Sequence, residues 1–398
     1  MGSRTVITCG AAGSDYPGFT HLAIQAAVEK AAQTGGEVLL TAGEYVLADS
    51  VHLRDHIVLR GSGIGETVLR KNASVKCTTE GFCGYGHKEI LVTDGRLFRA
   101  GDGVYLTGDT ACGFQATQTT VTEVEGNTVF LADPLEADVL KHRNGTIETI
   151  FPMIKCVNCT EVIVRDLTLE GNAEQNGCLG GCRGGAIFLI GCRDITVEHV
   201  KITDFNGEGF SYQQCRNIRI KDSECSYNRG NGVHPGSGTV GMLIEGCDLH
   251  HNRRAGIFYC LRICYNICRN NRIHHNGMEG ITIGHRDDHI EICGNEIFEN
   301  AREGIFFRPE NYPGMSGRYV SVHHNRISDN AREQGSAQIY APAALTGFEL
   351  YENTIGGPIS FLCDGELIES FLGEQEPENA RRIDIDRIPE REYRHLGT

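Results

Sequence analysis

The sequence predicts an all-β protein, a right-handed parallel β-helix (solenoid) with an N-terminal capping helix and a β-hairpin insertion. Three observations predict this fold: a repeat of about 24 residues, a glycine content of 50 in 398 residues, and a helical segment ahead of the repeats. Many glycines favour tight corners over long helices. A repeat array forms one elongated domain even when the chain is this long.

The repeat is clearest between residues 185 and 350. Within three or four residues of each repeated asparagine a glycine opens a short apolar strand, as in Gly280-Ile281-Thr282-Ile283. Three short strands and three turns per repeat describe one coil, and coils stack about 4.8 Å apart. An inward asparagine at a corner can then bond to the asparagine of the next coil and to the turn backbone. We expect such a stack from Asn228, Asn252, Asn276 and Asn300, with Asn206 in the preceding repeat.

The remaining segments divide the chain into four parts. Residues 1–74 hold the cap and the first coils, with an amphipathic helix over residues 20–33 that ends at Gly35-Gly36 and covers the open apolar end. Residues 75–150 break the period and predict a β-rich insertion of antiparallel hairpins. Residues 151–360 form the coils that carry the site. Residues 361–398 form a charged tail that either wraps the surface or is partly disordered.

Composition limits the classes of partner. The net charge of -15 argues against a general nucleic-acid binder, and no apolar run reaches the roughly 18 residues of a membrane span. Seventeen cysteines, an odd number, indicate mostly reduced, buried thiols and a cytoplasmic location. Met1-Gly2-Ser3 looks like the remnant of an added tag, so secretion stays open if a leader was removed. The oligomeric state is not indicated.

The N-terminal third resembles the pectate-lyase-like superfamily. The residues that carry this resemblance are Ala23-Ile24-Gln25-Ala26-Ala27, Ala42-Gly43-Glu44-Tyr45 and Leu59-Arg60-Gly61-Ser62-Gly63-Ile64-Gly65. Together with the repeats, it covers most of residues 20–355. The resemblance implies a parallel β-helix and an activity on poly- or oligosaccharides.

Strand alternation places a stripe of functional side chains on one outward face. If the residue after each repeat glycine points inward, the next points outward, which predicts the column Ser211, His234, Phe258, Thr282 and Phe306. Two residues further on, the column is Gln213, Gly236, Cys260, Gly284 and Arg308, and just beyond lie Arg262, His285, Arg286, Asp287 and Glu310. Aromatic rings stack on sugars and polar groups bind hydroxyls and carboxylates, so the stripe predicts a glycan site.

The favoured chemistry is β-elimination on a uronate-containing glycan. It needs a base of near-neutral pKa and cations beside the carboxylate, for which His234 and the pair Arg286 and Arg308 are suited. Substrate contacts are expected from Gln213, Phe258, Arg262, His285, Phe306 and Arg308. No metal or other cofactor is predicted; a bound divalent cation such as calcium stays open as an alternative but is not indicated by the sequence.

Epimerisation and hydrolysis are the alternatives. Gly232-Val-His-Pro resembles the repeats of mannuronan epimerases, whose Asp-Pro-His motif would place aspartate at His234 and histidine at Gly236. Hydrolysis needs two carboxylates, and Asp287 and Glu310 on neighbouring coils would lie roughly 5–9 Å apart.

A non-catalytic glycan-binding solenoid is a further alternative. Each of these residues also has a purely structural explanation. His234 would lie on a turn without a function, and Arg286, Arg308 and Glu310 would form an ion pair across coils. Residues 285–289 would form a solvated turn, and Cys260 would be a packing residue. Their convergence on one stripe favours a site.

Overall fold

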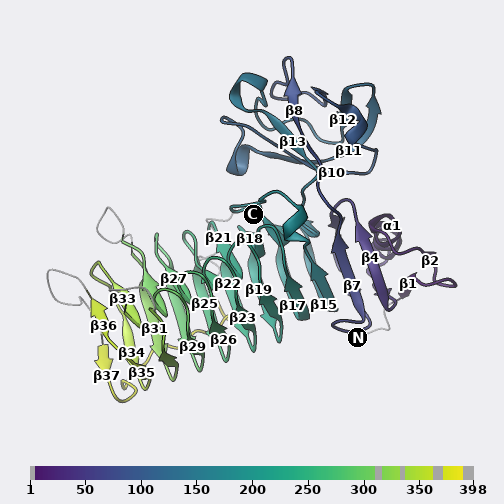
Figure 1. Ribbon diagram of the computed structural model, residues 1–398. Helices are drawn as coiled ribbons and strands as arrows, with labels where there is room; N and C mark the ends of the chain where they lie inside the picture. Colours follow the sequence, from purple (N-terminus) through teal and green to yellow (C-terminus); the bar gives the residue numbers. More distant parts are fainter. Residues whose placement is uncertain (1–4, 310–315, 332–336, 362–370, 389–398) are drawn as a thin grey trace.

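The computed structural model describes residues 5–309, 316–331, 337–361 and 371–388. The predicted parallel β-helix is confirmed: coils stack in a row along one axis, and a separate β-rich unit stands on one side of that row (Figure 1). Three sheets run the length of the helix, and we number them 1 to 3. Sheet 3 carries the predicted stripe.

Sheet 3 contains ten parallel strands, one from each coil. In spatial order these are β5 (Val51–His52), β14 (Ile154–Val157), β16 (Gly185–Ile190), β18 (Glu208–Gln213), β21 (Val233–Gly236), β24 (Ile257–Phe258), β27 (Ile281–Ile283), β30 (Ile305–Phe307), β33 (Ile339–Ala341) and β36 (Ile359–Phe361). Inward side chains such as Val233, Ile257 and Ile281 are fully buried in the core. Their neighbours therefore face outward, as alternation requires.

Sheets 1 and 2 complete the coils and share two long strands, β15 (Thr160–Glu170) and β17 (Arg193–Thr203). Both strands bend where a residue adopts positive φ, at Asp166 (57°) and His199 (50°). Sheet 1 also contains β1 (Val6–Gly10), β3 (Glu37–Leu40), β6 (Val58–Arg60), β19 (Arg216–Lys221), β22 (Val240–Glu245), β25 (Cys264–Arg269), β28 (Asp288–Cys293), β31 (Arg318–His323), β34 (Glu349–Tyr351) and β37 (Phe371–Gly373), with the short β2 (Tyr16–Pro17) beside β1. Sheet 2 also contains β4 (Gly43–Leu47), β7 (Thr67–Lys71), β20 (Glu224–Ser226), β23 (Asp248–His250), β26 (Arg272–His274), β29 (Glu296–Phe298), β32 (Arg326–Ser328) and β35 (Thr354–Gly356).

The predicted asparagine stack is confirmed at one corner. Asn228 Nδ2 donates to Asn252 Oδ1 (2.9 Å), Asn252 Nδ2 to Asn276 Oδ1 (3.0 Å), and Asn276 Nδ2 to Asn300 Oδ1 (2.9 Å). A second stack at another corner contains Asn271, Asn295, Asn325 and Asn353. These ladders satisfy the buried polar groups of the turns, which is why asparagine recurs once per coil.

The first open end of the helix is covered by α1 (His21–Ala32). Thr20 caps this helix, because its hydroxyl accepts a hydrogen bond from the Ala23 backbone N–H (3.3 Å). Ile24, Ala27, Val28 and Ala31 are buried and join the main core. The helix thus closes the apolar end of the solenoid.

Residues between β7 and β14 form a closed barrel with its own hydrophobic core. Its strands are β8 (Lys76–Glu80), β9 (Glu89–Val92), β10 (Gly103–Thr107), β11 (Thr117–Glu125), β12 (Thr128–Leu131) and β13 (Thr146–Glu148), and they pair antiparallel. Four short 3-10 turns, three of them in this unit, are η1 (Gly95–Leu97), η2 (Gly113–Gln115), η3 (Lys141–Arg143) and η4 (Ala173–Gln175). The barrel stands on the side of the helix that carries sheet 3 (Figure 1).

The described part of the C-terminal segment lies against sheet 1. Ile385 packs on Leu243 and Ile267, and Arg382 lies 3.9 Å from Glu291. The sixteen cysteines among the described residues are all free. In the same residues, no helix has the length and hydropathy that a bilayer span needs.

Candidate functional site

The outward column of sheet 3 has the predicted register. Ser211 lies beside His234, Phe258 beside Thr282, and Thr282 beside Phe306. His234 and Phe258 occupy neighbouring strands and meet edge to face, with ring centroids 5.2 Å apart. Tyr340 continues the column and stacks on Phe306 at 5.6 Å. Phe258, Phe306 and Tyr340 are partly exposed on this face, whereas the polar members Ser211, His234 and Thr282 are buried.

Two arginines lie over the ring of Phe258. The Arg308 guanidinium is 4.4 Å from the ring centroid, and that of Arg254 is 5.8 Å away. Arg308 is held in place because it donates to Thr282 Oγ1 (2.6 Å) and to the carbonyl of Cys260 (2.8 Å). Arg254 is exposed and was not predicted; it lies in the turn that precedes β24, where strand alternation does not apply.

His234 lies deeper than the sequence suggested, with only 5% of its surface exposed. It is surrounded by Glu208, whose Oε1 is 3.6 Å from Nδ1, and by the thiols of Cys182 and Cys260. Burial by itself lowers the pKa of His234, but the contacts with Cys260 and Glu208 outweigh burial and raise that pKa to about 9. A hydrogen bond between the two thiols lowers the pKa of Cys182 and raises that of Cys260.

The segment of residues 176–184, between η4 and β16, covers the outward side of β18. Ser211 Oγ donates to the carbonyl of Cys182 (2.6 Å). The barrel holds the same segment, because Arg183 donates to the carbonyl of Ala116 and forms an ion pair with Glu136, both at 2.9 Å. The barrel therefore helps to place Cys182 beside His234.

Two predicted residues do not lie on the accessible stripe. Asp287 was expected to be exposed and is instead fully buried. Its carboxylate accepts the backbone N–H groups of Gly284 (2.9 Å) and Ile263 (3.1 Å) and lies 3.9 Å from Arg308. Gln213 is also fully buried, with Nε2 donating to Ser211 Oγ (3.3 Å).

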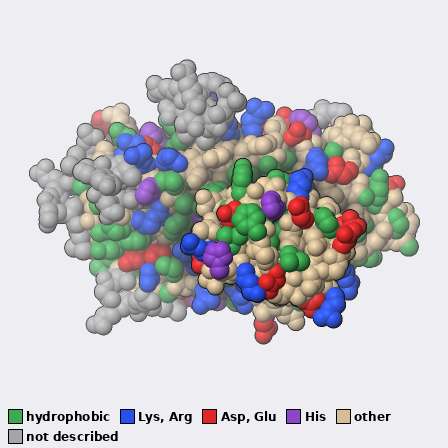
Figure 2. Space-filling model, turned by 90° about the horizontal axis from the view of Figure 1, so that it is seen from above, with side chains coloured by type: hydrophobic (Ala, Val, Ile, Leu, Met, Phe, Trp, Pro, Cys, Tyr) green, Lys and Arg blue, Asp and Glu red, His purple; other side chains and the backbone are tan. Residues whose placement is uncertain are grey.

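Three further predicted residues, Arg262, His285 and Arg286, are exposed in the turns that follow the sheet 3 strands. All three have positive φ, and the Arg262 N–H donates to the carbonyl of His285 (3.1 Å), so neighbouring coils repeat the same turn. Glu310 lies outside the described residues. Figure 2 looks down on this side of the molecule and shows His, Lys or Arg and hydrophobic side chains next to one another beside the barrel.

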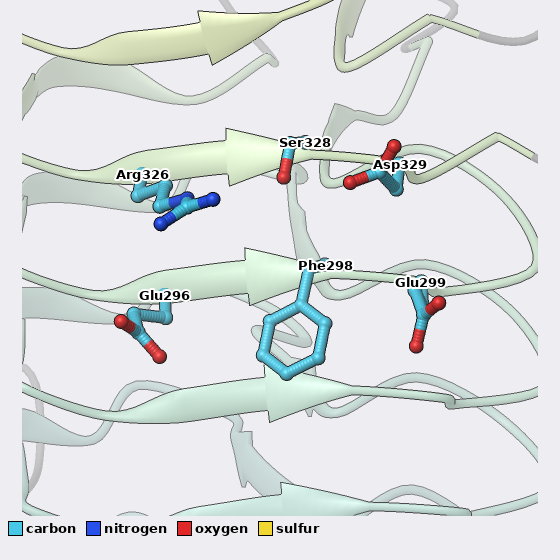
Figure 3. Close-up of a pocket in the computed structure, with 6 residues that line it drawn as sticks. All are labelled: Glu296, Phe298, Glu299, Arg326, Ser328 and Asp329. Atoms are coloured by element: carbon cyan, nitrogen blue, oxygen red, sulfur yellow. The ribbon is translucent and has the colours of Figure 1, made fainter.

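A separate pocket lies on sheet 2. Its cavity of about 310 Å³ is lined by Glu296, Phe298, Glu299, Arg326, Ser328 and Asp329, which come from β29, β32 and the turns after them (Figure 3). Phe298 continues a stack of rings, with His274 4.7 Å away. The strands that line this pocket belong to a different face from the stripe, so it is not part of the candidate site.

The sequence and the fold of this chain are similar to those of known β-helix proteins. Residues 185–355 match the family model described as "Right handed beta helix region". A Mannuronan C5-epimerase AlgE3 of Azotobacter vinelandii is 25% identical over 202 residues, which cover 46% of this chain and 10% of that protein. The chain thus spans about a tenth of the length of that relative.

Solved structures show the same fold. The A-module of the Azotobacter vinelandii Mannuronan C-5 epimerase AlgE6 superposes with a TM-score of 0.54 at 20% identity, covering 84% of this chain and 72% of that one. An alginate lyase from Paenibacillus sp. str. FPU-7 superposes with a TM-score of 0.53 at 12% identity, covering 93% and 99%. The right-handed coil is therefore established for this chain.

Proposed function

We propose that this chain, a right-handed parallel β-helix protein, is a carbohydrate-active enzyme that binds a uronate-containing glycan along the outward face of sheet 3. The observation that carries the proposal is the arrangement at Phe258, whose ring lies beneath the guanidinium groups of Arg254 and Arg308. The ring holds the two guanidinium groups by cation–π contact, and guanidinium groups bind carboxylates. The partly exposed rings of Phe306 and Tyr340 on the following coils offer apolar surface for a sugar, so the face matches a sugar acid.

Arg308 is suited to hold the carboxylate of such a substrate. Its two hydrogen bonds, to Thr282 and to the Cys260 carbonyl, fix the plane of the guanidinium before substrate arrives. A guanidinium has five N–H donors, so donors remain for a ligand. A fixed cation loses less entropy on binding and stabilises the charge that develops on the carboxylate when the neighbouring carbon loses a proton.

The reaction we propose is β-elimination. C5-epimerases and lyases of uronates share the first step, which removes the proton at C5 next to the carboxylate, and proteins of both kinds are similar to this chain. The position that the epimerase motif gives to histidine is occupied here by Gly236. This departure favours elimination over epimerisation as the outcome.

Hydrolysis is less well supported. It needs two carboxylates on either side of the glycosidic bond, within reach of the substrate. Asp287 is fully buried and its oxygens are hydrogen-bonded to backbone N–H groups of its own corner. A carboxylate held in this way stabilises a turn and does not reach a sugar.

The test is incubation of the full chain with polymers of mannuronate, guluronate and galacturonate and with neutral glycans as controls. Elimination creates an unsaturated uronate, which is followed by its ultraviolet absorbance. Loss of a charge-assisted hydrogen bond costs about 1.5–3 kcal/mol, so Arg308→Ala and Arg254→Ala should each weaken uronate binding by about 10- to 150-fold.

Arg253→Ala is the matched control, because Arg253 is the exposed neighbour of Arg254 and is not one of the two arginines over Phe258. It should leave binding and turnover unchanged. Absence of binding and of unsaturated product with every acidic polymer would contradict the proposal. Equal effects of Arg253→Ala and Arg254→Ala would contradict the assignment of the site.

A further inference from the structure

Three side chains with strong affinity for soft metal ions meet beside the stripe. The sulfur atoms of Cys182 and Cys260 and a ring nitrogen of His234 all lie within 4.8 Å of one another. Two thiolates and an imidazole are a donor set that zinc prefers. Bond lengths of about 2.3 Å for sulfur and 2.0 Å for nitrogen place tetrahedral ligand atoms about 3.5–3.8 Å apart, so a small closure would complete the site.

Buried polar atoms around the three ligands have no hydrogen-bond partner among the described residues. They are Nε2 of His234 and Oε1 of Gln213, and both side chains are at least nine-tenths buried; the nearest acceptor to His234 Nδ1 is the Glu208 carboxylate at 3.6 Å. A buried polar atom without a partner costs about 1–3 kcal/mol, so native proteins rarely leave several together. An ion bound to His234 removes this cost for the nitrogen that binds it.

Glu208 lies where a partner of a metal-bound histidine is expected. Its Oε1 is 3.6 Å from His234 Nδ1, which leaves Nε2 for the ion. Histidines that bind metals usually donate their other nitrogen to a carboxylate, which sets the orientation of the ring. Glu208 is itself nearly fully buried and accepts the Asn231 backbone N–H, so its position is fixed.

The absence of a side chain at Gly236 lets Gln213 pack directly against the backbone between His234 and Cys260. Gly236 lies between Gln213 and Cys260 in the second outward column, and a Cβ at this position would be 2.2 Å from Gln213 Oε1. Cys182 comes from the segment of residues 176–184, which Ser211 and the barrel hold over sheet 3. The three ligands therefore come from three separately anchored segments, which favours a preformed site.

A second group of similar residues lacks these properties. Glu291, Cys293 and His323 also lie within 4.8 Å of one another, on sheet 1. There, Arg382 Nη1 is 2.7 Å from His323 Nε2 and 3.9 Å from Glu291. A guanidinium in that place repels a cation, so this group is a charge network.

We propose that Cys182, His234 and Cys260 form a metal site for a thiolate-preferring divalent ion, zinc above all, with Glu208 as the carboxylate that orients His234. The fourth position is left for water or another ligand. The site lies next to Phe258, at the edge of the face where the glycan is proposed to bind, because His234 and Phe258 are in contact. A metal-bound His234 has no lone pair for proton abstraction, so the base of the reaction is another group.

The test uses the full chain, reduced and stripped of metal with a chelator. Zn²⁺ is titrated against a competing chromogenic chelator, and Co²⁺ serves as a spectroscopic probe, because tetrahedral cobalt with thiolate ligands absorbs in the visible and shows sulfur-to-metal charge transfer. We expect one ion per chain with this spectrum. Cys260→Ser and Cys182→Ser should abolish the charge-transfer band or reduce affinity by more than about 100-fold, and Glu208→Gln should weaken binding by about 10- to 100-fold.

Cys178→Ser is the matched control, because Cys178 is an exposed thiol on the same segment as Cys182. It should bind the ion like the unchanged protein. Circular dichroism of each variant checks folding, and Glu208→Gln keeps the test valid if a ligand variant does not fold. The proposal is overturned if Cys178→Ser and Cys260→Ser bind metal equally, or if the reduced chain retains no ion. It is also overturned if Cys182 and Cys260 form a disulfide and the chain still binds no metal after that disulfide is reduced. No glycan is present, so this result is independent of the glycan experiment.

Discussion

Replacement of Asn252 by leucine tests whether the asparagine ladder stabilises the coils. The Asn252 side chain is buried and makes four hydrogen bonds. Its Nδ2 donates to the carbonyl of Cys225 (2.9 Å) and to Asn276 Oδ1 (3.0 Å), and its Oδ1 accepts from Asn228 Nδ2 (2.9 Å) and from the Asn228 backbone N–H (3.3 Å). Each such bond contributes about 1 kcal/mol net, and leucine leaves the partners buried and unpaired. We therefore expect Asn252→Leu to lower the free energy of unfolding by about 3–5 kcal/mol.

The assay is equilibrium unfolding in urea, followed by circular dichroism and by tyrosine fluorescence, since the chain contains no tryptophan. Coincidence of the two transitions checks that one free energy describes the unfolding. Arg253→Leu, one residue further on and exposed, is the control and should change the free energy by less than about 0.5 kcal/mol. If Asn252→Leu is as stable as Arg253→Leu, the ladder does not hold the coils together.

Three further predictions concern stability and the thiols. Burial raises the pKa of Asp49 to about 6, whereas an aspartate of the unfolded chain has a pKa near 4. Between these two pH values the folded chain binds more protons than the unfolded chain, so the melting temperature should fall as pH rises from about 4 to about 6. Asp49→Asn should flatten this part of the plot of melting temperature against pH. Thiol titration of unfolded, unreduced protein should find a large majority of the 17 cysteines reactive, and a majority in the oxidised form would contradict the predicted reducing compartment. Ile385→Ala should cost about 2 kcal/mol in urea unfolding, because the side chain packs on Leu243 and Ile267, and an unchanged midpoint would show that the C-terminal segment contributes nothing.

The coils could be predicted from the repeat length of about 24 residues, and the stripe from the two-residue alternation of side chains along a strand. A spacing of 24 residues is the length of one coil, so the register of Asn228 with Asn252 is contained in the sequence. Strict alternation within a strand assigns His234 and Phe258 to the outward side. Core residues such as Ile257 follow from the same rule.

The prediction for Asp287 failed because alternation ends with the strand. β27 ends at Ile283, and the next residues, His285 and Arg286, have φ of 50° and 67°. This turn directs the Asp287 carboxylate back to the backbone N–H of Gly284. Short polar side chains in turns commonly bond to nearby backbone in this way.

Contacts that involve irregular segments, or segments far apart in the chain, could not be predicted from the sequence. Cys182 belongs to a segment without periodicity, and the barrel that holds it closes through pairing of β8 with both β9 and β13. Arg254 precedes its strand, so no alternation rule assigned it to the stripe. The sequence does contain one indication of Arg254. An arginine stands two residues after the repeated asparagine in two coils, as Arg254 after Asn252 and as Arg302 after Asn300.

The most direct test of the central claim is a comparison of two aromatic residues on different faces. Phe258 lies on the proposed glycan face of sheet 3, and Phe298 lines the pocket of sheet 2 (Figure 3). The measurement is the dissociation constant of a uronate oligosaccharide, by calorimetry, for the unchanged chain, Phe258→Ala and Phe298→Ala. Loss of the ring that holds Arg254 and Arg308 by cation–π contact costs about 1–2 kcal/mol, so Phe258→Ala should weaken binding by about 5- to 30-fold and Phe298→Ala should leave it unchanged. Weaker binding by Phe298→Ala with no effect of Phe258→Ala would place the glycan on the other face and contradict the account.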